Sequence, residues 1–181
     1  MGSNQTNWQI IDSDVVKRCR LPIENAVPGV VDILAYWQGR CRGADLPRKA
    51  DIHPWDLKEQ LGRLCIIEVQ VEPLDFIYRL DGSNIASVTQ QDLTGQSVLS
   101  VTPEEYANAI YEDLRETLVV NAPLLWHVDL NIPPAVYPYQ RLVLPLTSGE
   151  GAAITHLMTY SHRLDSRDGA FPWFKRYGQP D

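Results

Sequence analysis

The sequence has few cysteines, and they are far apart. Cys19, Cys41 and Cys65 form an odd set at wide separations in a chain of 181 residues. This distribution is typical of reduced intracellular thiols and excludes a dense disulfide framework. Because no C-x-x-C or H-x-x-x-H pair supplies neighbouring ligands, we predict no structural zinc site and assign no metal-binding residue.

Long apolar runs and an excess of positive charge are also absent. No apolar run approaches the roughly 20 residues needed to span a bilayer, and the first residues, MGSNQTNWQIIDSD, lack the basic and apolar segments of a secretory signal. The 16 basic and 23 acidic residues give a net charge of −7, and no basic stripe is interleaved with aromatic residues. We therefore expect a cytoplasmic protein whose partners are neither membranes nor nucleic acids.

The common catalytic patterns are missing too. The sequence contains no Gly-x-Ser-x-Gly elbow, no evident cysteine–histidine arrangement and no phosphate-binding glycine fingerprint. His156 and His162 lie on one predicted strand about 20 Å apart, which is too far for them to share a metal ion. We therefore assign no catalytic residue and predict that the protein is not an enzyme.

What the chain does contain is enough apolar sequence for one domain, with 44% hydrophobic residues. The predicted strands come in groups joined as hairpins, so the expected class is α+β with an antiparallel sheet. The predicted elements are, in order, a helix at 28–42, a short helix at 54–61, strands at 64–71 and 76–81, helical turns at 83–91, a long helix at 103–120, and strands at 124–131, 139–146 and 152–163.

The two longer predicted helices have clear boundary signals. Pro28 suits the first position of one helix and Gly43 marks its end. The long helix has Thr102 as its predicted N-cap, Pro103 as its first residue and Glu105 completing a capping box. The first helix has an apolar stripe that packs either on the domain or against a second copy, formed by Val30, Val31, Leu34, Trp37 and Cys41.

The first two strands form a predicted hairpin that turns at residues 72–75. With Val71 opposite Phe76, one face of the hairpin is apolar and Glu68 lies opposite Arg79. Arg79 is then either half of a structural ion pair or a ligand-binding group whose planar guanidinium recognises a carboxylate.

The order of elements from this hairpin onward resembles a PAS domain, a five-stranded antiparallel sheet with its helices gathered on one face. The segments LAYWQGRCRGADLPRKADIHPWDL, LGRLCIIEV, FIYRLDGSNI and DLTGQSV are similar to a bacterial single-domain PAS-like family, of the PAS_5 type. The resemblance covers roughly residues 30–163. It implies a sensory or regulatory module that binds a small ligand between sheet and helices and dimerises, without naming the ligand.

The resemblance also separates this chain from two cofactor-binding PAS classes. The light-sensing flavin class, LOV, carries a reactive cysteine in an Asn-Cys-Arg-Phe-like motif, and the matching segment SNIASVTQQDL has none. The oxygen-sensing haem class uses a histidine on the long helix, and residues 103–120 contain none. Both cofactors are therefore disfavoured, and no cofactor is assigned.

Residues on the predicted strands are the candidates for ligand binding. Aromatic side chains with a few polar tips are typical of small-molecule sites beneath a covering helix, although the same side chains also fill cores. The candidate ligand-binding residues are Tyr78, Arg79, Trp126, His127, Tyr139, Arg141, His156 and Tyr160.

The domain boundaries and the function remain predictions at this point. The expected division is an N-terminal extension at 1–26, a flanking helix at 27–43, a PAS-like domain at 44–164 and a C-terminal tail at 165–181. The leading hypothesis is a sensory module that acts through a signalling partner or as a homodimer formed by the 28–42 helix. One alternative is an interaction scaffold with a filled core. Another is a small enzyme of cystatin-like or hot-dog fold, for which His127 and Asp129 lie on one strand face.

Overall fold

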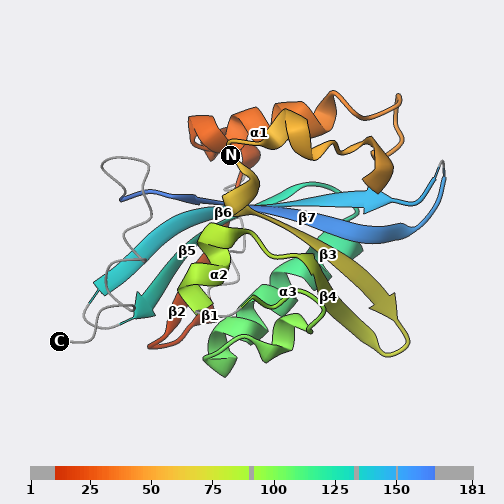
Figure 1. Ribbon diagram of the computed structural model, residues 1–181. Helices are drawn as coiled ribbons and strands as arrows, with labels where there is room; N and C mark the ends of the chain where they lie inside the picture. The colour runs from red at the N-terminus through yellow and green to blue at the C-terminus, as the bar shows by residue number, and fades with distance from the viewer. Residues whose placement is uncertain (1–10, 90–91, 133–134, 150, 166–181) are drawn as a thin grey trace, which may run out of the picture.

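The structure, a computed structural model, describes residues 11–89, 92–132, 135–149 and 151–165, and its centre is one antiparallel sheet (Figure 1). Its strands are β1 (Ile11–Asp12), β2 (Val16–Leu21), β3 (Leu64–Val71), β4 (Leu74–Leu80), β5 (Leu124–Ile132), β6 (Ala135–Thr147) and β7 (Ile154–Arg163). Within the described residues the order across the seven-stranded sheet is β1-β2-β5-β6-β7-β3-β4. The predicted α+β class with an antiparallel sheet is confirmed, although the sheet has two strands more than the five expected.

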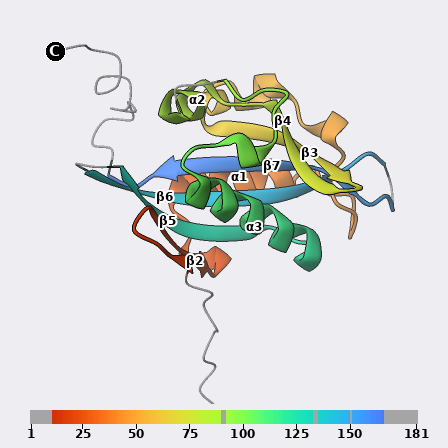
Figure 2. The same cartoon turned by 90° about the horizontal axis from the view of Figure 1, so that it is seen from below.

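Helices cover both faces of this sheet. The flanking helix α1 (Pro28–Gln38) lies on one face, and α2 (Ser83–Thr89) and α3 (Glu104–Val120) lie on the other (Figures 1 and 2). Figure 2 shows α3 in front of the central strands. Short 3-10 helices complete the fold: η1 (Ile23–Asn25), η2 (Lys49–Asp51), η3 (Pro54–Leu57), η4 (Leu61–Arg63) and η5 (Val98–Ser100).

Alternation of side chains along the strands separates two hydrophobic cores. On β5, Leu124 and Trp126 point into the core beneath α3, whereas Leu125 between them points into the core beneath α1. The α3 core also contains Phe76, Tyr78, Leu114, Val143 and Leu157. The α1 core also contains Trp37, Leu64, Leu142, Met158 and Tyr160. The sheet is therefore stabilised from both sides by apolar burial, at about 1.5–3 kcal/mol for each large aliphatic side chain.

The apolar stripe of α1 packs on its own domain. The helix buries Val30, Ile33, Leu34 and Trp37. The indole Nε1 of Trp37 donates to the carbonyl of Pro145 at 3.0 Å, which fixes the helix to β6. Val31, predicted to be part of the stripe, is 47% exposed because Ile33 takes the inward position. The helix ends at Gln38, with Gly39 as its C-cap, rather than near residue 42.

The segment predicted to be an N-terminal extension supplies the two additional strands. β2 pairs along its whole length with β5, from Val16 opposite Leu130 to Leu21 opposite Leu125, and β1 pairs with β2. No apolar alternation marks β2, because the positions that follow Val16 on the α3 face are arginines, Arg18 and Arg20. Because these inward-facing positions are polar, hydrophobic periodicity does not indicate a strand here.

The start of α3 also differs from the prediction. The helix begins at Glu104 with Pro103 in the N-cap position, and no side chain forms a capping hydrogen bond. Thr102 is one residue too far from the helix to cap it, so the predicted capping box is wrong. The helix ends at Val120, and its C-cap Asn121 has a φ of 56°, the left-handed conformation that asparagine tolerates.

The β3–β4 hairpin turns more tightly than predicted. Val71 pairs with Leu74 rather than with Phe76, so the register differs by two residues from the predicted one. From Ile67 to Val71 each side chain nevertheless stays on its predicted face, because side chains alternate with a period of two, whereas an irregularity at Ile66 and Ile67 brings Leu80 opposite Ile66. The turn contains only residues 72–73 between the strands.

The predicted ion pair across this hairpin is confirmed. Glu68 lies opposite Ile77, and Arg79 reaches it diagonally. The Nε of Arg79 donates to the Glu68 carboxylate at 2.6 Å. Both side chains are partly exposed, so the pair is a surface feature.

The segment NIPPAVYP is mostly strand and not the long loop that its prolines predict. The β5–β6 ladder continues to Ile132 opposite Ala135, and residues 133–134 lie outside the described residues. Pro138 is tolerated in β6 because β7 ends at Arg163, opposite Tyr139, so the proline has a paired strand on one side only. The tail aromatics Phe171, Trp173, Phe174 and Tyr177 also lie outside the described residues.

The turn from β4 into α2 requires a glycine. A Cβ atom on Gly82 would lie 2.6 Å from the carbonyl oxygens of Gly62 and Leu64. Asp81, next to it, accepts hydrogen bonds from the backbone N–H of Leu93 at 3.2 Å and from the thiol of Cys65 at 3.5 Å. The stretch FIYRLDGSNI is thus a structural junction between a strand and a helix.

Cys65 is expected to resist alkylation in the folded protein. Burial, together with the nearby Asp81 carboxylate, raises the pKa of its thiol to about 12, and the thiolate is the reactive form. Cys19 and Cys41 are only half-buried. Mass spectrometry after iodoacetamide treatment at pH 8 should show both of these modified well before Cys65, and all three modified after denaturation. Equal rates for Cys65 and Cys41 in the native protein would contradict the structure.

Candidate functional site

A cluster of charged side chains is buried between α3 and the sheet. Asp113 on the inner side of α3 has no solvent exposure. Its carboxylate accepts a hydrogen bond from Arg141 of β6 at 2.6 Å and a second, short one from Arg18 of β2. The two arginines are 4% exposed each. One carboxylate therefore joins three elements that are far apart in the sequence.

Two tyrosines hold the other side of the Arg141 guanidinium. Its Nη2 donates to the hydroxyl oxygens of Tyr106 and Tyr139, and the two hydroxyls lie 2.9 Å apart. The guanidinium carbon is also 5.6 Å and 5.4 Å from the centroids of these rings, within cation–π range. Arg141 is thereby fixed in position by Asp113, Tyr106 and Tyr139.

The cluster contains one more positive charge than negative charge. Burial acts to raise the pKa of the Asp113 carboxyl, whereas the Arg141 and Arg18 guanidinium groups act to lower it, and direct contact with both guanidinium groups favours the ionised carboxylate. Burial raises the pKa of Tyr139 well above its usual value, which keeps the hydroxyl neutral. Two guanidinium groups thus share one carboxylate in the interior.

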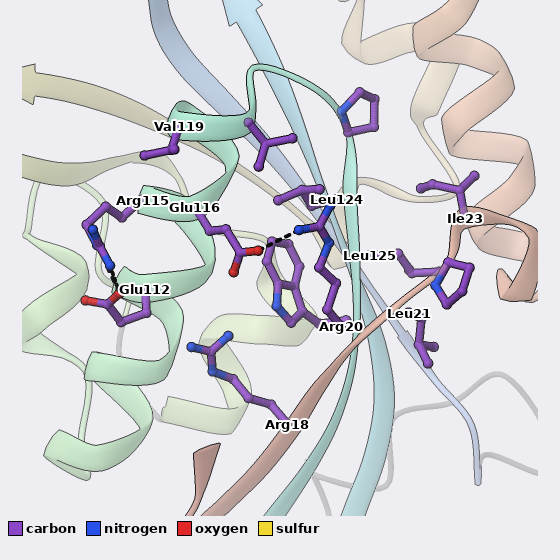
Figure 3. Close-up of a pocket in the computed structure, with 14 residues that line it drawn as sticks. Arg18, Arg20, Leu21, Ile23, Glu112, Arg115, Glu116, Val119, Leu124 and Leu125 are labelled. Carbon is purple, nitrogen blue, oxygen red and sulfur yellow. Dashed lines mark hydrogen bonds and ion pairs between the residues drawn. The ribbon is translucent and has the colours of Figure 1, made fainter. Parts of the chain in front are cut away.

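An open cleft of about 730 Å³ lies beside the cluster. One wall is the second half of α3, and the other is β2 with the start of β5 (Figure 3). We call it the α3–β2 cleft. Its lining includes the buried side chains of Arg18 and Trp126, and a mainly apolar group formed by Leu21, Pro22, Ile23, Val119, Val120, Pro123, Leu124 and Leu125.

The rim of the α3–β2 cleft carries two ion pairs. Arg20 of β2 donates to Glu116 of α3 at 2.7 Å, which links the two walls. Arg115 donates to Glu112 on the same helix at 2.9 Å and 2.6 Å. Both pairs are drawn as dashed lines in Figure 3. The rim is therefore polar and electrically balanced.

Arg18 connects the cleft with the buried cluster. Its side chain lines the cleft and donates to Asp113. Its Nε–H, however, is shielded from solvent and has no hydrogen-bond partner among the described residues. A buried donor without an acceptor costs about 1–3 kcal/mol, which identifies this nitrogen as a position where a ligand acceptor would be stabilising.

The candidate ligand-binding residues fall on two faces of the sheet. Trp126 lines the α3–β2 cleft, Tyr139 and Arg141 belong to the buried cluster, and Tyr78 lies in the same core. The structure therefore brings together Trp126, Tyr139 and Arg141 near one cleft.

The other four candidates lie elsewhere. Arg79 pairs with Glu68 on the hairpin surface. Tyr160 is in the core beneath α1, where its hydroxyl donates to Gln60 at 3.1 Å. His127 Nε2 lies 3.0 Å from Asp129 Oδ1 on the face of β5 that points away from Trp126.

His156 contacts its neighbour Thr155, with Nδ1 and Oγ1 3.1 Å apart. Its strand β7 is separated from the His127 strand β5 by β6. Nothing brings the two histidines into one site. In the described part of the chain, no group of three or more histidine, cysteine, aspartate and glutamate side chains is arranged to hold a metal ion.

The chain matches a known protein family over most of its length. A family model described as a PAS domain, PAS_5, matches residues 26–159. The chain belongs to the PAS domain family. No curated protein matches the chain. Among the described residues of this PAS domain, no helix is long and apolar enough to cross a membrane.

The family match begins after β2, which changes the interpretation of the cleft. The strand that carries Arg18 and Arg20 lies outside residues 26–159, whereas Asp113, Glu116 and Trp126 lie inside. The α3–β2 cleft is therefore formed between the matched PAS domain and the strand that precedes it.

Sequence reasoning missed Arg18 and Asp113, the two residues that define this site. A signal for Asp113 was present: it lies three residues after Ile110 and four before Thr117, both on the buried side of α3. Arg18 had no such signal, because its strand was not recognised.

Proposed function

We propose that this PAS domain is a regulatory module that binds a small ligand in the α3–β2 cleft and acts through a protein partner or a second copy. The family membership supports a sensory or regulatory role in general. The position of the cleft between the sheet and the long helix supports the site. The observation that carries the proposal is Arg18, a buried side chain that lines the cleft with a free donor at Nε.

The size and lining of the cleft support this function. Its volume of about 730 Å³ is within the range of about 300–1,000 Å³ typical of small-molecule sites. Apolar walls with a few placed polar groups are the usual composition of such sites. Val119 and Val120 of α3 supply exposed apolar surface on one wall, and Trp126, which is 1% exposed, packs at the base.

Ligand binding in this position would act on the contact between β2 and α3. The ion pairs Arg18–Asp113 and Arg20–Glu116 join β2 to α3 across this contact. A ligand held by both walls would stabilise β2 on the sheet. Because β2 precedes the matched PAS domain, a partner protein or a second copy would detect the change in how firmly β2 is held.

The test is ligand capture followed by a blocking substitution. Native mass spectrometry of the protein purified from its own host should show a bound small molecule, and the molecule should raise the melting temperature when added back. Val119→Trp, at an exposed position of the cleft wall, should abolish this rise while leaving the unliganded melting temperature unchanged. Val71→Trp, equally exposed on the β3–β4 hairpin, is the matched control.

Two results would contradict the proposal. One is the absence of any copurified molecule together with the absence of stabilisation in a metabolite screen. The other is a ligand whose stabilising effect survives Val119→Trp, since that ligand would bind elsewhere.

A further inference from the structure

The geometry points to an anionic ligand for the α3–β2 cleft: a carboxylate or phosphate group bound at Arg18 and carried on an apolar body. This inference rests on the proposed function, because it names the chemistry of the ligand that the cleft would bind. Carboxylate and phosphate are treated together because both present several oxygen acceptors to a guanidinium group.

The charge of the buried cluster is the first argument. Arg18 and Arg141 are buried with Asp113 as their shared carboxylate, and the hydroxyl of Tyr139 is neutral. One positive charge is therefore uncompensated in the interior. Buried charges are paired or solvated in stable proteins, and the side of the cluster that opens to the cleft is Arg18. An anion at this position would balance the charge.

The free donor of Arg18 is the second argument. One terminal nitrogen, Nη1, donates to Asp113, while Nε–H has no acceptor in the described part of the protein. A guanidinium group presents its donors in a planar fork that matches the oxygens of a carboxylate or a phosphate. Because Nε–H is shielded from solvent, an anion would reach it only when the Arg18 side chain shifts toward the cleft, while Nη1 keeps its hydrogen bond to Asp113.

The apolar walls define the rest of the ligand. Above Arg18 the cleft is lined by Trp126, Leu124 and Ile23, and by Val119 and Val120 from α3. An inorganic anion would leave this surface unfilled. The arrangement fits a molecule with an aromatic or aliphatic body and one acidic end.

A cationic ligand fits the same cleft poorly. The two rim carboxylates, Glu112 and Glu116, are paired with Arg115 and Arg20. A cation would compete with these arginines and would approach the uncompensated charge at Arg18. Because the charges at the rim are paired, the positive charge of Arg18 at the base of the cleft determines that a negatively charged ligand is favoured.

The test compares acids with their uncharged amides. Isothermal titration calorimetry at low ionic strength would measure phenylacetate, indole-3-acetate and octanoate against phenylacetamide, indole-3-acetamide and octanamide, with phenyl phosphate as the phosphate probe. At least one anion should bind, and its amide should bind about tenfold more weakly or worse. Phenyl phosphate and phenylacetate distinguish the two anion types.

Substitutions then test whether the anion binds at Arg18 in the α3–β2 cleft. Arg18→Lys keeps the charge beside Asp113 but removes the planar fork, so affinity for the anion should fall by about tenfold with the fold intact by circular dichroism. Arg20→Gln at the rim should also weaken anion binding at low salt. Arg79→Gln is its matched control, since Arg79 is equally exposed and equally paired but lies on the hairpin. Arg79→Gln should leave the affinity for the anion unchanged.

The outcomes separate the two proposals. Amides that bind as tightly as their acids, or an absence of binding by every anion in the series, would overturn the anionic ligand. So would a folded Arg18→Lys variant with unchanged affinity. A neutral ligand that is blocked by Val119→Trp would overturn this inference and leave the proposed function standing. The proposed function fails separately, when nothing copurifies and nothing stabilises the protein.

Discussion

Replacing Asp113 by asparagine is expected to lower the free energy of unfolding by about 3–5 kcal/mol. The carboxylate is fully buried and pairs with both Arg18 and Arg141. An amide of nearly the same volume removes the negative charge and leaves two guanidinium groups uncompensated in the interior. The loss is large because the arginines keep their desolvation cost without a counter-charge. Urea denaturation followed by circular dichroism measures it.

A second set of substitutions separates charge from packing. Glu112→Gln on the exposed side of α3 removes a carboxylate that pairs with Arg115 on the surface, so stability should not change measurably. The triple variant Arg18→Met, Asp113→Leu, Arg141→Met replaces the cluster by apolar side chains of similar length, and it should be more stable than Asp113→Asn alone. A loss under about 1 kcal/mol for Asp113→Asn would show that the pairing contributes little.

The β3–β4 hairpin shows which features sequence periodicity determines. Burial on one face specifies side-chain parity, so Phe76 and Tyr78 were placed correctly in the core. A shift of two residues leaves this parity unchanged, so hydrophobic periodicity does not distinguish the two registers. The Glu68–Arg79 pair formed despite the error because long side chains also reach diagonal neighbours.

The central helix shows a second limit of the sequence. Apolar spacing located α3 and its inner face through Tyr106, Ile110 and Leu114, all of them buried. Asp113 lies on the same face, but an aspartate in a helix is ordinarily solvent-exposed. Only the positions of Arg18 and Arg141 on distant strands make its burial favourable, and those positions depend on tertiary pairing.

The candidate site could be predicted only in part for the same reason. Trp126 and Arg141 were found because they lie on strands beneath the long helix. The α3–β2 cleft itself requires residues 18–23 to lie beside residues 112–126. No local pattern encodes this proximity, because β2 carries arginines where a typical half-buried strand carries apolar residues.

Removing residues 1–21 is expected to cost at least about 3 kcal/mol of stability and to promote self-association. Burial of Val16 alone contributes about 1.5–3 kcal/mol, and the buried cluster loses Arg18. β5 would also become an edge strand, because β2 pairs with it from Leu125 to Leu130. Unpaired N–H and C=O groups along such an edge bind other strands. Urea denaturation and light scattering measure the two effects.

The control is a chain that begins at Ile11 and keeps both β1 and β2. It should match the full-length protein in stability and in oligomeric state, because the pairing of β2 with β5 is retained. If the chain that begins at Pro22 is equally stable and monomeric, β2 is an accessory strand and the matched PAS domain is stable without it. If it is destabilised as expected, the strand that precedes the PAS domain is part of its fold. The states with β2 attached and detached then differ greatly in stability, and a ligand that bridges β2 and α3 would favour the attached state.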